Sequence, residues 1–125
     1  METLNIAGTE DTPTITLNYD SGEFIFSGRS LPEDVTSFYA PVITWLDGFS
    51  GNPKDGAKFH FKLEYFNTAS SKILLDILMK IEEIAEESGK SFGIVWYSQD
   101  SDPDMKEAGE EYADIVSVPF EYQSY

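Results

Sequence analysis

The chain has 125 residues, and its 23 acidic and 8 basic side chains give a net charge of −15 at neutral pH. This length suits a domain with its own core, and a hydrophobic content of 41% argues against intrinsic disorder. A surface of this charge repels phosphate backbones and anionic lipid, so we expect neither nucleic-acid nor membrane binding. The charge instead favours partners that carry a basic patch.

Composition also limits the chemistry and the location of the protein. The chain has no Cys, which excludes disulfides, thiolate nucleophiles and zinc–cysteine sites and fits a reducing compartment. The N-terminal residues lack the basic region and apolar run of a signal peptide, and no apolar stretch approaches the roughly 18 residues of a membrane span. We therefore expect a cytoplasmic protein in which residues 1–125 form a single domain.

The first half of the chain predicts an antiparallel hairpin and then a helix. Alternating apolar and polar residues indicate strands over residues 4–6, 14–20 and 24–28. Ser30 is expected to cap the first helix, with Pro32 in its first turn and Glu33 completing a capping box. Apolar residues at helical spacing then continue to Phe49.

The second half alternates strands with helices. We predict strands at residues 57–65, 91–97 and 115–122, and helices that begin at residues 67–71 and 102–103. In the first of these strands we expect Tyr65 on the inward face and Lys58, His60 and Lys62 on a wet face. The apolar run at 91–97 indicates a central strand covered on both faces, and Pro119 indicates an edge strand or an irregularity in the last strand.

This order of elements predicts the fold class. Strands joined through helices require right-handed crossovers and a mostly parallel section of sheet. The hairpin near the N-terminus adds an antiparallel edge. We therefore predict a small α/β domain with a mixed sheet and about three helices.

The start of the long helix is the strongest candidate site. The segment Asn67-Thr68-Ala69-Ser70-Ser71-Lys72 places three hydroxyls between the carboxyl end of a strand and a helix. Unpaired backbone N–H groups and the helix dipole favour an anion there, and open α/β sheets place functional sites at this end of their strands. A phosphate on Thr68 would add nearly two negative charges, and Lys72 could pair with it. The simpler interpretation is that Asn67, Thr68 or Ser70 only caps the helix, a contribution of about 1 kcal/mol.

Other polar residues give weaker indications. Four acidic side chains have the spacing of EF-hand calcium ligands: Asp100, Asp102, Asp104 and Glu111. Met105, however, stands where that loop needs Gly. His60 lies in mid-strand, and no nucleophile and acid can be assigned to it from spacing. We therefore assign no catalytic residue, metal or cofactor, and we expect a protein that is not an enzyme.

The sequence resembles the SiaC family of bacterial regulatory phosphoproteins, whose fold is similar to the STAS domains of anti-sigma factor antagonists. The resemblance covers essentially the whole chain, and its most specific part is the Asn-Thr-x-Ser-Ser segment between a strand and a long helix. It runs through Thr12-Pro13, the segment from Gly28 to Glu33, Phe38-Tyr39 with Pro41, Trp45-Leu46, the segment from Leu63 to Thr68 with Ser70-Ser71-Lys72, the segment from Leu75 to Leu78, Trp96-Tyr97 and Pro119-Phe120.

The resemblance implies a phosphorylation switch. The family's phosphorylated threonine corresponds to Thr68, which a dedicated kinase phosphorylates and a PP2C-type phosphatase dephosphorylates. The unphosphorylated form binds and activates a diguanylate cyclase, which raises cyclic di-GMP and promotes aggregation or biofilm formation. The remaining residues of the switch region, which a partner would contact, are Asn67, Ser70, Ser71 and Lys72.

One residue departs from the family motif, and two other functions stay open. Ala69 stands where the motif has a serine, a change that leaves the Thr68 acceptor intact but bears on kinase recognition. The first alternative is a partner switch of the anti-sigma factor antagonist type. The second is a small-molecule or metal-binding domain that uses the acidic loop from Asp100 to Asp104.

Overall fold

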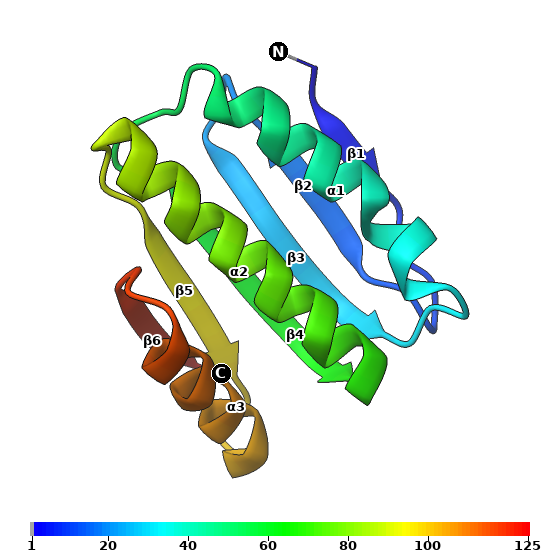
Figure 1. The fold of residues 1–125 in the computed structure, drawn as a ribbon. Coiled ribbons are helices and arrows are strands. Elements are labelled where there is room, and N and C mark those ends of the chain that lie inside the picture. Colours follow the sequence, from blue (N-terminus) through cyan, green and yellow to red (C-terminus); the bar gives the residue numbers. More distant parts are fainter. Residues whose placement is uncertain (1) are drawn as a thin grey trace.

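A mixed sheet with helices on one face makes up the computed structural model, which describes residues 2–125 (Figure 1). In chain order its elements are β1 (Leu4–Ile6), β2 (Thr14–Asn18), β3 (Glu23–Ser30), α1 (Val35–Ser50), β4 (Lys58–Phe66), α2 (Thr68–Ser88), β5 (Gly93–Ser98), α3 (Pro103–Ile115) and β6 (Phe120–Ser124). Within these residues, no helix is both long and apolar enough to cross a membrane.

The order of strands in the sheet follows the chain, from β1 to β6. Strands β1, β2 and β3 pair antiparallel, whereas β3 to β6 pair parallel through one helix at each connection. Because the order advances in one direction, right-handed crossovers place α1, α2 and α3 on the same face, as Figure 1 shows. The predicted α/β class with an N-terminal antiparallel hairpin is confirmed. The prediction of a central strand covered on both faces is wrong, because β5 lies next to the edge strand β6 and has helices on one face alone.

The core fills the space between the sheet and the helices. Phe26 and Phe61 stack with their ring centroids 4.6 Å apart at its centre. On the α3 side, the buried Trp96 donates its indole N–H to the Met105 carbonyl at 2.9 Å, and Gly109 of α3 lies directly against the Trp96 ring. The strands contribute alternate residues to this core, as their period of two predicts: Ile15, Leu17, Phe24, Phe26, Phe59, Phe61 and Leu63.

Local capping signals correctly locate two of the helices. Asn67 caps α2, and α2 ends at Gly89, whose φ of 72° is the left-handed conformation that glycine adopts easily. Asp102 caps α3 and accepts a hydrogen bond from the Met105 N–H at 3.2 Å. Asn67 and Asp102 lie within the ranges where the sequence predicts these two helices to begin.

The start of α1 differs from its prediction. Asp34 caps this helix and accepts from the Ser37 N–H at 3.1 Å, and Val35 is the first helical residue. The interpretation of Ser30 as the cap is wrong, and Pro32 lies before the helix. Ser30 is instead the last residue of β3, and its fully buried hydroxyl bonds with groups from α1 and α2. Tertiary contacts thus override a local capping pattern.

Tyr65 also differs from its prediction, because the β3–β4 ladder shifts register. Gly28 pairs with Leu63, whereas Arg29 pairs with Tyr65, which leaves Glu64 as an extra residue. Such a bulge turns the following side chain to the opposite face. Tyr65 is accordingly 46% exposed and lies beneath the Arg29 guanidinium, 5.5 Å from it.

The last strand begins later than the predicted range of 115–122. Helix α3 continues through Ile115, so β6 covers Phe120–Ser124. Pro119 precedes the strand and accepts from the Ile94 N–H at 2.9 Å. Strand β6 pairs with β5 and ends the sheet, so the edge position predicted from Pro119 is confirmed.

The face of the sheet without helices carries the polar residues of β4, as predicted. Lys58 and Lys62 are exposed, and His60 between them is half-buried with Nδ1 2.8 Å from the Tyr97 hydroxyl. Lys58 forms an ion pair with Glu121 at 2.6 Å. Burial and, to a lesser degree, the charge of Lys58 lower the pKa of His60 below its ordinary value of 6.5.

The lowered pKa of His60 predicts a pH effect on stability. Below about pH 6.5 the unfolded chain binds a proton at His60 more readily than the folded chain does. The contribution of neutral His60 to the free energy of unfolding is therefore complete above this pH and falls as the pH decreases. Replacing His60 by Gln removes this contribution. We expect the free-energy difference between wild type and His60→Gln, from urea unfolding, to shrink between about pH 7.5 and about pH 5.5. A difference that stays constant would contradict the assigned direction of the pKa shift.

Candidate functional site at the start of helix α2

Thr68 is the first residue of α2 and is exposed at the carboxyl end of β4. Among residues 2–125 its hydroxyl makes no hydrogen bond, and the backbone N–H groups of Thr68 and Ala69 meet no acceptor. The neighbouring Asn67 makes the cap, since its side chain accepts from the Ser70 N–H at 2.9 Å and its carbonyl from the Ser71 N–H at 2.9 Å. The Thr68 hydroxyl is therefore available for chemistry that leaves the cap intact.

This geometry predicts different effects for two adjacent alanine substitutions. Asn67→Ala should lower the free energy of unfolding by about 1 kcal/mol, because the helix loses its side-chain cap. Thr68→Ala should change it by less than about 0.5 kcal/mol, because an exposed hydroxyl without a partner is removed. Urea unfolding of the two variants measures both values. Equal losses would contradict the assignment of the cap to Asn67.

The other two serines of the predicted switch region are less accessible than Thr68, since Ser70 is buried and Ser71 is half-buried. Ser70 is fully buried; its Oγ donates to the Ser30 carbonyl at 2.9 Å and lies 2.8 Å from the Ser30 Oγ. The Ser30 Oγ in turn lies 2.6 Å from the Tyr39 hydroxyl, and burial raises the pKa of Tyr39 to about 12. The Ser71 carbonyl accepts from the Tyr112 hydroxyl of α3 at 2.8 Å. The interpretation of Ser70 as a residue that a partner contacts is therefore corrected, because its hydroxyl is sealed in the core.

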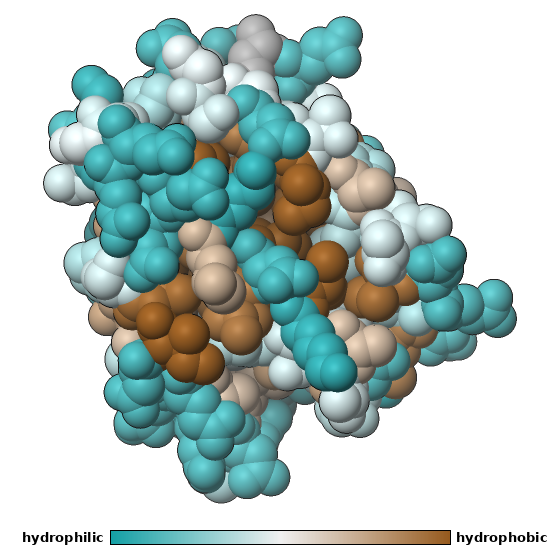
Figure 2. Space-filling view, in the orientation of Figure 1, coloured by the Kyte–Doolittle hydropathy of each residue, from teal (hydrophilic) through white to brown (hydrophobic). Residues whose placement is uncertain are grey.

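A groove between α1 and α2 begins at Thr68. Its first part is a hollow of about 500 Å³, lined by Val35, Thr36, Thr68, Ala69, Lys72, Ile73 and Asp76. A second hollow of about 400 Å³ shares two of these residues and is lined by Ile43, Ile73, Asp76, Met79, Lys80 and Glu83. The two hollows therefore follow one another along α2, and together we call them the α1–α2 groove. Figure 2 shows hydrophobic surface between the two helices on this face.

The α1–α2 groove combines apolar side chains with charges of both signs. Met79 is 47% exposed, and together with the half-buried Ile43 and Ile73 it gives the groove a partly exposed apolar lining. Along α2, Lys72, Asp76 and Lys80 alternate in sign at intervals of one turn. Lys80 Nζ is held 2.5 Å from a carboxylate oxygen of Asp47, and the hydrogen bond raises the pKa of Lys80. The groove can thus accept an apolar ridge flanked by polar groups.

The sequence interpretation missed the apolar residues of this groove. Ile43, Ile73 and Met79 are half-buried or exposed, and they lie outside the buried stripe of their helices. Apolar residues off the main stripe are the one signal that could have located the groove. The pairing of α1 with α2 across the groove is determined by tertiary packing.

The acidic loop before α3 does not assemble an ion site in the described part of the chain. Asp102 is occupied as the cap of α3, and the helix begins at Pro103, inside the predicted loop. Among residues 2–125, no three His, Cys, Asp or Glu side chains lie close enough together to hold a metal ion. Asp104 instead lies in the first turn of α3, where a negative charge complements the helix dipole.

Sequence comparison relates the whole chain to one family. A family model described as SiaC family regulatory phosphoprotein matches residues 6–125. An uncharacterised protein from Pseudomonas aeruginosa strain UCBPP-PA14 is 30% identical over 125 residues, which is 100% of this chain and 98% of that protein. The match leaves no long unmatched segment in either sequence.

Solved structures from Pseudomonas aeruginosa share the fold. Apo-SiaC superposes with a TM-score of 0.89 at 30% identity, covering 98% of this chain and 99% of its own. The complex of the diguanylate cyclase SiaD with its activator SiaC contains a chain with the same TM-score, identity and coverage. The resemblance stated from the sequence is therefore confirmed, and the chain belongs to the SiaC family of regulatory phosphoproteins.

Proposed function

We propose that this protein is a phosphorylation-switched activator of a diguanylate cyclase. Its unphosphorylated form binds the cyclase at the α1–α2 groove and raises cyclic di-GMP, which promotes aggregation or biofilm formation. A cognate kinase phosphorylates Thr68, and a PP2C-type phosphatase removes the phosphate. Residues 1–125 act as one regulatory domain in the cytoplasm.

The observation that carries this proposal is the position of Thr68 at one end of an apolar groove. Its exposed hydroxyl is accessible to a kinase, and the same residue lines the surface that a partner would cover. A phosphate there would meet the N–H groups at the start of α2, with Lys72 one turn away. The phosphorylated chain therefore keeps its fold, while the groove gains a charge that a docked partner would have to desolvate.

A relative whose complex has been solved supports a diguanylate cyclase as the proposed partner. The SiaC of Pseudomonas aeruginosa, 30% identical and of the same fold, is the activator in a solved complex with the diguanylate cyclase SiaD. Helix α2 and the preceding cap give Thr68 a rigid frame, so binding needs no folding of a mobile segment. This favours control of an interface over control of the fold.

Intact-mass analysis of the chain purified from its native host tests the switch residue. We expect wild type to contain a species heavier by one phosphate, and Thr68→Ala to lack it. Thr36→Ala is a matched control, because Thr36 is exposed in the same hollow and should leave the phosphorylated species in place. A phosphate that persists in Thr68→Ala would assign the modification to another residue.

A second experiment tests the docking surface. Met79→Lys should weaken binding to the host diguanylate cyclase by about tenfold, because a charge replaces the apolar contact of the groove. Ile115→Lys is the control, since Ile115 is 58% exposed at the end of α3, outside the groove. Isothermal titration with unphosphorylated protein measures both. Equal affinities of the two variants would remove the α1–α2 groove from the interface.

A further inference from the structure

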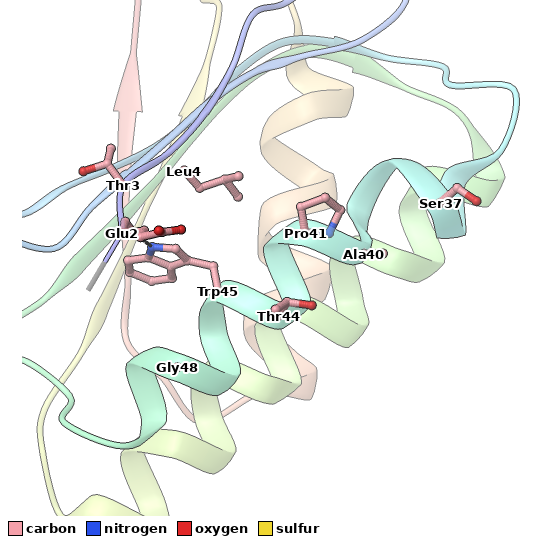
Figure 3. A pocket seen from close by; sticks show the side chains of 9 residues that line it. All are labelled: Glu2, Thr3, Leu4, Ser37, Ala40, Pro41, Thr44, Trp45 and Gly48. Carbon is pink, nitrogen blue, oxygen red and sulfur yellow. Dashed lines mark hydrogen bonds between the residues drawn. The ribbon is translucent and has the colours of Figure 1, made fainter.

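A third hollow lies on the other side of α1, at the margin where the sheet ends with β1. It encloses about 780 Å³ between α1 and the segment that leads into β1 (Figure 3). The α1 residues that line it are Ser37, Ala40, Pro41, Thr44, Trp45 and Gly48, and Glu2, Thr3 and Leu4 close its other side. None of these residues lines the α1–α2 groove, so the helix separates the two surfaces.

The walls of this third hollow suit an aliphatic chain. Leu4 and Pro41 supply apolar surface, and Trp45, which is buried to 7% exposure, contributes only a ring edge to the lining; all three are labelled in Figure 3. Ala40 and Gly48 keep the helix surface low, since neither has a side chain beyond Cβ. A flexible methylene chain laid along these side chains removes apolar surface from water without bringing its own charge into the core.

The polar groups around the same hollow mostly accept hydrogen bonds. The Trp45 indole N–H already donates to the Glu2 carbonyl at 3.0 Å, and the Ser37 hydroxyl donates to Asp34 at 2.9 Å. Pro41 has no N–H, so the Ser37 carbonyl lacks its usual partner within the helix. The lining includes the exposed carboxylate of Glu2 and no basic side chain. An apolar hollow that offers acceptors and a negative charge fits the side chain of Lys or Arg.

We infer that this hollow is a second docking site, for a basic segment of a partner protein. The stem of a Lys or Arg lies along Pro41 and Leu4, beside the edge of Trp45, and its charged end approaches Glu2. The net charge of −15 steers such a segment toward the chain. Because α1 stands between this site and Thr68, binding here is independent of Thr68 phosphorylation. This site therefore goes beyond the proposed switch and can retain a partner in both states.

The two tryptophans supply a direct test by NMR. The probe is the peptide acetyl-Lys-Val-Lys-Val-Lys-amide, added to the full chain at physiological salt, with the acetyl-Glu-Val-Glu-Val-Glu-amide peptide as its control. We expect the lysine peptide to shift the indole resonance of Trp45 and to leave that of Trp96, which is buried and bonded to Met105, unchanged. No shift at Trp45, or equal shifts with both peptides, would overturn the inference.

Matched variants separate this site from general attraction to an acidic protein. Thr44→Lys, in the hollow, should weaken peptide binding by about fivefold, whereas Thr36→Lys, on the other side of α1, should leave it nearly unchanged. Thr68→Asp should bind the peptide as wild type does, whatever becomes of cyclase binding. Equal losses in the two lysine variants, or loss in Thr68→Asp, would contradict an independent site. A Trp45 shift that follows protein concentration alone would assign the hollow to a second copy of this chain.

Discussion

Phosphorylation of Thr68 should weaken binding of the diguanylate cyclase more than a hundredfold. The phosphate carries nearly two negative charges and three acceptor oxygens, and it stands at the end of the α1–α2 groove. A partner that covers the groove must remove water from this phosphate, and the partner surface that fits a neutral threonine has no positive charge to offer it. The N–H groups of the helix start and Lys72 compensate only part of this charge, and a remaining desolvation cost of about 3 kcal/mol corresponds to more than a hundredfold in affinity.

The substitution Thr68→Asp should show the same effect at smaller size. Asp carries one charge in place of nearly two, so we expect a loss of at least about tenfold, measured by titration calorimetry. Ser101→Asp adds the same charge in an exposed position outside the groove, and we expect it to bind the cyclase as wild type does. Thermal melting should show both variants folded. Wild-type affinity in a folded Thr68→Asp variant would mean that the cyclase docks elsewhere.

The substitution Gly109→Ala should lower the free energy of unfolding by about 2–3 kcal/mol. A Cβ at this position would lie 2.4 Å from Cδ1 and 2.6 Å from Nε1 of Trp96. The ring cannot move aside easily, because it is buried and donates to the Met105 carbonyl at 2.9 Å, and it packs against Tyr112. Helix α3 would have to shift away from β5 to make room.

The steric clash and helix propensity predict opposite changes in the stability of Gly109→Ala. Helix propensity alone predicts that Gly→Ala inside a helix stabilises the protein by up to about 1 kcal/mol. Gly48→Ala is the matched control, because Gly48 is an exposed residue within α1 and should show no loss of stability. Urea unfolding measures both variants. A Gly109→Ala protein as stable as wild type would contradict the close approach of α3 to Trp96.

Periodicity was enough to predict most of the fold, because strands and helices bury every second residue or one stripe. The local capping pattern at Ser30 misled because the Ser30 hydroxyl bonds with Tyr39 on one side and with Ser70, 40 positions away, on the other. Tyr65 was misplaced for a related reason, since the extra residue Glu64 is visible only in the pairing of two strands. Neither event leaves a signal within a short window of sequence.

The residues of the candidate site also differ in whether a local sequence signal marks them. Thr68 and Asn67 could be singled out because a strand end, a cap and a helix start are local features. The α1–α2 groove could not, because its shape depends on how far apart two packed helices lie. Its residues come from segments about 30 positions apart, and only the apolar Ile43, Ile73 and Met79, outside the buried stripes of their helices, give a signal for it.

The choice of Asn67 as the cap of α2 has a consequence for the lifetime of the protein. In the proposed cycle, adding or removing a phosphate at Thr68 leaves each hydrogen bond of the helix start in place. The phosphorylated form then opens no more often than the unmodified form, so phosphorylation does not expose the chain to proteases. A cell can therefore change the ratio of the two forms many times without having to synthesise the protein anew.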